Sequence, residues 1–231
     1  MNVEYLLPII CFWRTISTEI SKHKENSPAI INNFVSFIHC ISYIVHYNYD
    51  YNLDYAVHMS IGFFIYDLIY IFSNLNRTCQ TQTRTQIKND LKQQAPFILH
   101  HIAGICLLNT ALTSDANQQY ILYSYHILEK SNIMIYISYY LHKQYAEYVR
   151  LNIISNFMQL IVYSYYRLIQ LPLYCYNTKQ LIYQFHFTTQ FLIAAIYCMG
   201  LAWSYRLLIK NIANFYIVWS PTRSMKYSST G

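Results

Sequence analysis

Two adjacent histidines, His100 and His101, are the residues of this sequence best suited to chemistry at neutral pH. An imidazole titrates near neutral pH, so it can act as a general base or attack an acyl group as a nucleophile. Carboxylates that could orient such an imidazole stand at Asp67 and Glu129. We therefore take His100, His101, Asp67 and Glu129 as candidate catalytic residues, and a purely structural role for the histidine pair stays open.

Metal binding is the competing use of these histidines. No second histidine at a ligating spacing accompanies the pair, and none of the six cysteines forms a CxxC motif. The sequence therefore predicts neither a zinc site nor a disulfide framework. We expect no metal and no resident cofactor.

The elements that must position these residues are long apolar stretches. Only 11% of the 231 residues are charged, against about a quarter in soluble domains, whereas 55% are hydrophobic. Each stretch approaches the roughly 20 residues that a helix needs to cross a membrane. They predict an all-α, polytopic membrane helix bundle of six to seven transmembrane helices. The six are 29–47, 55–73, 96–113, 118–141, 151–174 and 181–209, and the shorter stretch 3–13 is the seventh candidate.

Basic residues alternate along the segments that connect these helices. The positive-inside rule places the basic segments and the C-terminus in the cytosol, so the sequon at Asn76 should stay unglycosylated. The expected organisation is an N-terminal anchor and cytosolic segment (1–28), a membrane domain (29–210) and a cytosolic tail (211–231). No basic run with interleaved aromatics predicts a nucleic-acid partner. The segments placed in the cytosol carry the following basic residues: Arg14, Lys22 and Lys24; Arg77, Arg84, Lys88 and Lys92; Lys143 and Arg150; Arg206, Lys210, Arg223 and Lys226.

Ionisable and polar residues also recur inside the predicted spans. A charged side chain in hydrocarbon is costly and usually faces a partner or a cavity. Asp67 and the histidine pair share the cytosolic half of their helices, whereas Arg167 falls in the outer half, too far away for a direct pair with Asp67. Interhelical hydrogen bonding is the alternative use of such residues. The longest polar stripe, at helical spacing, is Asn152, Asn156, Gln159, Tyr163, Tyr166 and Gln170.

Four segments together resemble the TLC-domain family over residues 29–210. They are the stretch from Ser60 to Asp67, the His100-His101 pair, the run Glu129-Lys130-Ser131-Asn132, and Tyr166-Arg167-Leu168 with Pro172. The resemblance implies a six- or seven-helix membrane domain, commonly of the endoplasmic reticulum, that encloses a lipid-sized cavity. The candidate cavity residues are His39, Tyr66, Ser131, Asn132 and Arg167.

Two functions follow from this resemblance. Ceramide synthases of the family carry a His-Asp-x-x-Asp type motif, whereas this sequence has Glu129 and Asn132 in place of the two aspartates. Glu129 and Ser131 resemble the Glu-x-Ser pattern of the non-synthase branch. The leading interpretation is a protein that binds, senses or modifies membrane lipids in lipid homeostasis. The alternative is an acyl-CoA-dependent N-acyltransferase that uses the histidine pair, with acyl-CoA as co-substrate. A cargo receptor or a structural role needs no histidine pair, and homo-oligomerisation stays open.

Overall fold

The computed structural model describes residues 3–23, 27–49, 52–81, 83–113 and 115–219, and every element in these ranges is a helix. The predicted all-α class is therefore confirmed. The elements in chain order are α1 (Val3–His23), α2 (Pro28–Asn48), α3 (Leu53–Thr81), α4 (Arg84–Thr113), α5 (Asp115–Gln144), α6 (Val149–Ser164), the π-helical segment η1 (Tyr165–Gln170), α7 (Leu171–Asn177), α8 (Lys179–Gln184) and α9 (Phe187–Trp219).

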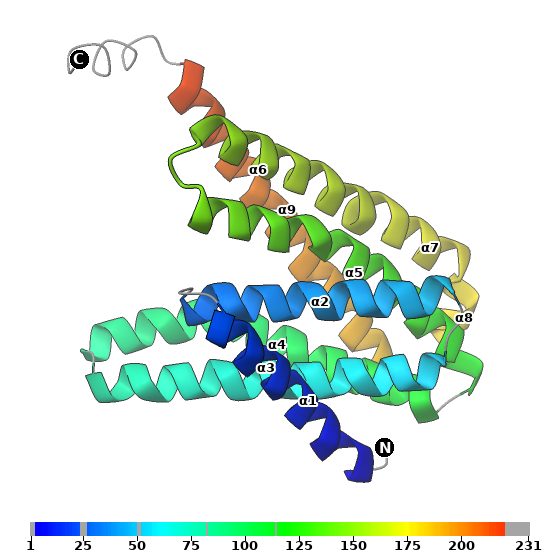
Figure 1. Cartoon of the computed structure of the whole chain (residues 1–231). Coiled ribbons are helices and arrows are strands. Elements are labelled where there is room, and N and C mark those ends of the chain that lie inside the picture. The colour runs from blue at the N-terminus through cyan, green and yellow to red at the C-terminus, as the bar shows by residue number, and fades with distance from the viewer. Residues whose placement is uncertain (1–2, 24–26, 50–51, 82, 114, 220–231) are drawn as a thin grey trace, which may run out of the picture.

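The long helices form an up-and-down bundle. α3 packs beside α4 and α5 lies between α2 and α6, while α1 crosses α3 obliquely and α9 runs behind α5 and α6 (Figure 1). The α3–α4 and α5–α6 connections and the C-terminal end of α9 lie at one end, which we call the basic end (Figure 1). The alternation of charge along the sequence thus becomes a difference between the two ends of the bundle. Exposed basic residues near the basic end include Arg77, Lys88, Lys92, Lys143 and Arg150.

Four helices are long and apolar enough to cross a membrane: α2, residues 53–77 of α3, residues 86–113 of α4 and residues 187–215 of α9. These helices indicate an integral membrane protein. α5 carries many polar residues that lower its mean hydropathy, whereas α6 has only 16 residues because η1 interrupts the helix that continues it.

Several helices extend beyond the apolar stretches that predicted them. α1 has 21 residues and ends at His23, so the helix predicted to end at Trp13 was too short. α4 begins at Arg84, so the expectation that Pro96 starts this helix is wrong. Its first turns are polar but contain good helix formers, and the apolar pattern alone did not reveal them. Pro96 is tolerated inside α4 although it cannot donate a hydrogen bond to the carbonyl four residues earlier.

The last two predicted helices differ more strongly from the structure. The segment 181–209 is not one helix, because Phe185 and His186 separate α8 from α9. α9 continues to Trp219, so residues 211–219 of the expected tail are helical, and residues 220–231 lie outside the described residues.

The segment 151–174 contains a change of helix type. η1 separates α6 from α7, and the Leu171 N–H donates to the Tyr166 carbonyl, five residues earlier. Pro172 follows immediately, and in an α-helix its ring would clash with the carbonyl of Leu168 and leave that carbonyl without a donor. The wider turn therefore lies where Pro172 disfavours the regular α-helical pattern.

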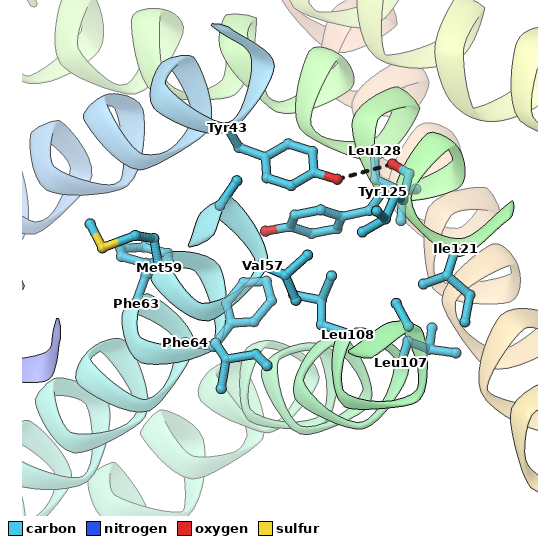
Figure 2. Packing of buried hydrophobic residues seen from close by; sticks show 14 of the residues in the cluster. Tyr43, Val57, Met59, Phe63, Phe64, Leu107, Leu108, Ile121, Tyr125 and Leu128 are labelled. Carbon is cyan, nitrogen blue, oxygen red and sulfur yellow. Dashed lines mark hydrogen bonds between the residues drawn. The ribbon is translucent and has the colours of Figure 1, made fainter. Parts of the chain in front are cut away.

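An aromatic core fills the bundle away from the basic end. Tyr43 donates to the Leu122 carbonyl (3.1 Å), and its ring meets that of Tyr125 edge-on with 4.5 Å between centroids (Figure 2). Trp13 Nε1 donates to the Met59 carbonyl (3.0 Å) and ties α1 to α3. This core fixes the part of α3 that immediately precedes Asp67.

Candidate functional site

A pocket of about 610 Å³ lies between α2, α3, α4, α5, η1 and α9, and we call it the central pocket. Its volume falls within the range of roughly 300–1,000 Å³ that is typical of small-molecule sites. Most of the lining is aromatic or aliphatic, and the polar residues come from several helices. Six of the candidate site residues line it: Asp67, His100, His101, Glu129, Asn132 and Arg167.

Asp67 and His101 form a buried pair between the adjacent helices α3 and α4. Asp67 Oδ2 lies 2.6 Å from His101 Nε2, and Asn32 Nδ2 donates to Asp67 Oδ1 (2.7 Å). Both residues of the pair are 7% exposed. Because an ionised carboxylate only accepts hydrogen bonds, His101 Nε2 carries the hydrogen. In the neutral ring Nδ1 is then the basic nitrogen, and it has no hydrogen-bond partner among the described residues.

His100 occupies a different position from its neighbour. Adjacent residues of a helix point about 100° apart, and the His100 and His101 ring centroids are 5.6 Å apart. The His100 ring meets Phe64 edge-on at 6.2 Å and lines the central pocket. The two imidazoles are thus distinct: Asp67 orients His101, whereas no carboxylate lies within 4.0 Å of His100 in the described part of the chain.

Glu129 and Asn132 lie three residues apart on α5 and both reach the central pocket. Glu129 is 3% exposed, and its Oε2 has no hydrogen-bond partner in the described ranges. Its backbone carbonyl accepts from Cys40 Sγ (3.1 Å), which ties α5 to α2. A carboxyl group is therefore held beside the pocket with one buried oxygen that no described residue satisfies.

Arg167 comes from η1 and is 4% exposed. Its Nε donates to Ser131 Oγ (2.8 Å), one Nη2 hydrogen points to Asn132 Oδ1 (3.4 Å), and the guanidinium lies 5.1 Å from the Tyr163 ring centroid. Arg167 makes no ion pair with a described carboxylate, Asp67 included. These neutral groups orient the cation without neutralising it.

The other three candidate residues lie outside the lining of the central pocket. His39 stacks on Phe63 (4.1 Å between centroids), and its Nε2 lies 3.0 Å from Ser60 Oγ. Tyr66 is buried beside the same Phe63. Ser131 acts on the pocket through Arg167, since its own hydroxyl donates to the Leu128 carbonyl (2.6 Å).

The chain matches the family model of the TLC domain over residues 9–220. The protein belongs to the TLC-domain family. No curated protein and no solved structure matches the chain. The match in this TLC-domain protein begins within α1 and ends just after α9, so it covers a longer range than the resemblance over 29–210.

Sequence reasoning did not place several residues of this TLC-domain site. Asn32, which holds Asp67, belongs to a polar series on α2 with Ser36, and that series was its only signal. Gly200 lines the pocket beside Arg167, where a Cβ atom would lie 3.4 Å from Arg167 Cδ. Phe97 and Trp203 meet edge-on at 5.2 Å between α4 and α9, and no spacing along the chain predicts such a contact.

Proposed function

We propose that this TLC-domain protein holds a membrane lipid in the central pocket and binds, senses or modifies it in lipid homeostasis. The observation that carries the proposal is the buried Asp67–His101 pair, both residues of which line a pocket inside the helix bundle. Ionisable residues inside a membrane protein are costly, and they mark functional sites when they face a cavity.

The lining of the central pocket suits an amphipathic ligand. Glu129 and Arg167 form its polar part, whereas side chains such as Ile71 and Met199 offer apolar surface. The lining also includes Asp90 and Gln94, which lie on α4 toward the basic end. A lipid can therefore place its polar group among the buried charged residues and its chain along the apolar wall.

The test is retention of lipid during purification. Met199 lines the pocket and Met158 does not, so Met199→Trp and Met158→Trp are a matched pair. We expect mass spectrometry of extracts to find lipid with the wild type and with Met158→Trp, and much less with Met199→Trp. Lipid-free wild-type protein, or equal lipid in both variants, would contradict the proposal.

The second candidate function is the acyl-CoA-dependent N-acyltransferase, and the free Nδ1 of His101 favours it. An amine would attack the thioester carbonyl, forming a C–N bond as the C–S bond breaks. An imidazole of the pair would accept the amine proton, and the CoA thiolate would leave and take up a proton. Asp67 would orient His101 for this step.

An assay with acyl-CoA and a sphingoid base separates the two functions. The departures at Glu129 and Asn132 from the synthase motif lead us to expect no amide product, with lipid retained instead. Amide formation that His101→Ala abolishes at unchanged protein abundance would establish the acyltransferase.

We further propose six to seven membrane crossings in the endoplasmic reticulum with the basic end in the cytosol. The distribution of exposed Lys and Arg at the two ends supports this orientation. Asn76 should then stay unmodified in microsomes, whereas a sequon engineered next to Asp115, in a connection lengthened to give access, should be glycosylated. Modification of Asn76 would reverse the topology.

A further inference from the structure

Two charged groups of the central pocket have hydrogen-bonding capacity that the protein does not use. A guanidinium has five N–H donors, and Arg167 uses two of them, toward Ser131 and Asn132, so three remain. Glu129 Oε2 accepts from none of the described residues. Both residues are more than nine-tenths buried, where an unmet charge is costly.

Arg167 and Glu129 do not neutralise each other by direct contact. They line the same pocket, yet no ion pair within 4.0 Å joins them. Asn132 stands between them: it contacts Arg167 and lies one helical turn from Glu129. Neighbours at this spacing have Cβ atoms about 5–6 Å apart. The pocket therefore presents a cation and a carboxyl group side by side, separated by a neutral amide.

The remaining acidic residues of the pocket have other surroundings. Asp67 is held by His101 and Asn32, so its charge is already met. Asp90 lies toward the basic end of α4 and is only partly buried. Arg167 and Glu129 are thus the two deeply buried charged groups of the pocket that a ligand has to complete.

We propose, building on the proposed function, that Arg167 and Glu129 form a two-point site for a zwitterionic headgroup. The anionic oxygens, such as those of a phosphodiester, bind the free guanidinium N–H groups of Arg167, which match such oxygens in a fork geometry. The ammonium group of the same molecule binds Glu129 Oε2. Tyr136, on the same helix as Glu129, also lines the pocket and offers aromatic surface to a bound cation.

Competition between three dioleoyl lipids that differ in headgroup charge, with oleylamine as a single-chain cation, tests the proposal. Delipidated protein in detergent receives dioleoyl phosphatidylethanolamine (zwitterionic), dioleoyl phosphatidic acid (anionic), dioleoylglycerol (neutral) or oleylamine (cationic), and native mass spectrometry measures the bound fraction. A further arm uses free phosphoethanolamine, which separates a lipid headgroup from a soluble zwitterion. We expect the wild type to prefer the zwitterionic lipid over the neutral one by on the order of 10- to 100-fold.

Variants of the two residues should shift this preference in opposite directions. Arg167→Gln should lose about tenfold in affinity for both phosphate-bearing lipids and retain oleylamine. Glu129→Gln should lose affinity for oleylamine and gain about tenfold for phosphatidic acid relative to phosphatidylethanolamine. Arg206→Gln and Glu147→Gln each remove one charge at an exposed position outside the central pocket and should leave the preference unchanged. Should Arg167→Gln not fold, Arg167→Lys keeps the charge but loses the fork geometry, and Glu129→Gln remains decisive.

The outcomes separate this proposal from the proposed function. Two outcomes would overturn the two-point site: equal binding of the neutral and zwitterionic lipids by the wild type, or an equal loss of affinity for every lipid in both variants. In either case the wild type would still bind lipid, so the proposed function would stand. Strong phosphoethanolamine binding without lipid binding would reassign the site to a soluble ligand. Absence of binding in every arm would remove the lipid-binding function itself.

Discussion

The charged residues of the central pocket fall into two regions that differ in how their charge is met. On the α3–α4 side, Asp67 receives hydrogen bonds from both His101 and Asn32. On the α5–α9 side, the hydrogen bonds of Arg167 to described residues go to neutral groups, and Glu129 Oε2 accepts from none of the described residues. The charge of Asp67 is therefore met within the protein, although His101 Nδ1 has no described partner, whereas we propose that a ligand meets the charges on the α5–α9 side.

Packing around the glycines shows the same contrast. A Cβ atom added at Gly62 would collide with Ile9, and one added at Gly104 would lie 2.6 Å from Phe64 Cε2. At Gly200, on the α5–α9 side, the closest atom would be Arg167 Cδ at 3.4 Å. The α3–α4 contact at Gly104 and the α1–α3 contact at Gly62 thus leave no room for an extra methyl group, whereas the contact at Gly200 does.

The largest expected effect comes from removing the Asp67 carboxylate. Asp67→Ala leaves His101 Nε2 and Asn32 Nδ2 without their acceptor, so the free energy of unfolding should fall by about 3–5 kcal/mol. Denaturant titration in detergent measures this change. Asp90→Ala removes a partly buried acid that forms no ion pair with a described residue, so it should change this free energy by less than about 0.5 kcal/mol. Equal effects of the two variants would show that the pair does not stabilise α3 against α4.

Adding methyl groups tests the packing difference. Gly62→Ala and Gly104→Ala should each destabilise the protein by about 1–3 kcal/mol, because neighbouring helices must shift. Gly200→Ala introduces nearly ordinary contacts and should cost less than about 1 kcal/mol, so its thermal unfolding midpoint should stay closest to the wild type. A larger loss at Gly200 would show that the α5–α9 side is as tightly packed as the α3–α4 side.

Removing the cation should matter mainly when lipid is present. Arg167→Met deletes a buried charge without a carboxylate partner, so the lipid-free protein should change by less than about 1 kcal/mol. Lipid at 100 times its Kd should stabilise the wild type by about 2.7 kcal/mol and the variant by much less. Thermal shifts with and without phosphatidylethanolamine measure both effects. A large loss without lipid would mean that the protein itself depends on this cation.

The smallest expected effect concerns a polar contact away from the pocket. Ser138 Oγ donates to Asn156 Oδ1 (3.3 Å), and the same oxygen accepts from His142 Nε2 (2.9 Å) and Lys210 Nζ (2.9 Å). Ser138→Ala leaves two of these contacts, so the loss should be near the average of about 0.6 kcal/mol for interhelical hydrogen bonds in membranes. A loss above about 2 kcal/mol would be well beyond this average of ~0.6 kcal/mol. It would show that Ser138 stabilises the structure by more than one hydrogen bond.

The sequence predicted helices better than it predicted where they end. Apolar stretches located α2 and the membrane part of α3, because length and hydropathy are local properties. The polar turns before Pro96 and the break at Phe185 depend on helix propensity and packing, which an apolar pattern does not contain.

The site was predictable in part for a similar reason. The cost of a charge in hydrocarbon pointed to Asp67, His101, Glu129 and Arg167, which all line the central pocket. His39 is also an ionisable residue inside a predicted span, but it packs against Phe63 and Ser60 and does not line the pocket. A polar residue can find its partner in a packed core as well as in a cavity. Only the arrangement of the helices distinguishes these two outcomes.

The π-helical turn η1 makes Arg167 depend on the number of residues in a helix as well as on their identity. Four residues spaced four apart are all buried: Gln159, Tyr163, Arg167 and Leu171. In a regular α-helix with 3.6 residues per turn, residues at this spacing would turn progressively away from one face. The wider turn absorbs the surplus rotation. An insertion or deletion of one residue before Arg167 in this segment would therefore rotate Arg167 around the helix axis. Its guanidinium would then face lipid, although the amino acid itself is unchanged.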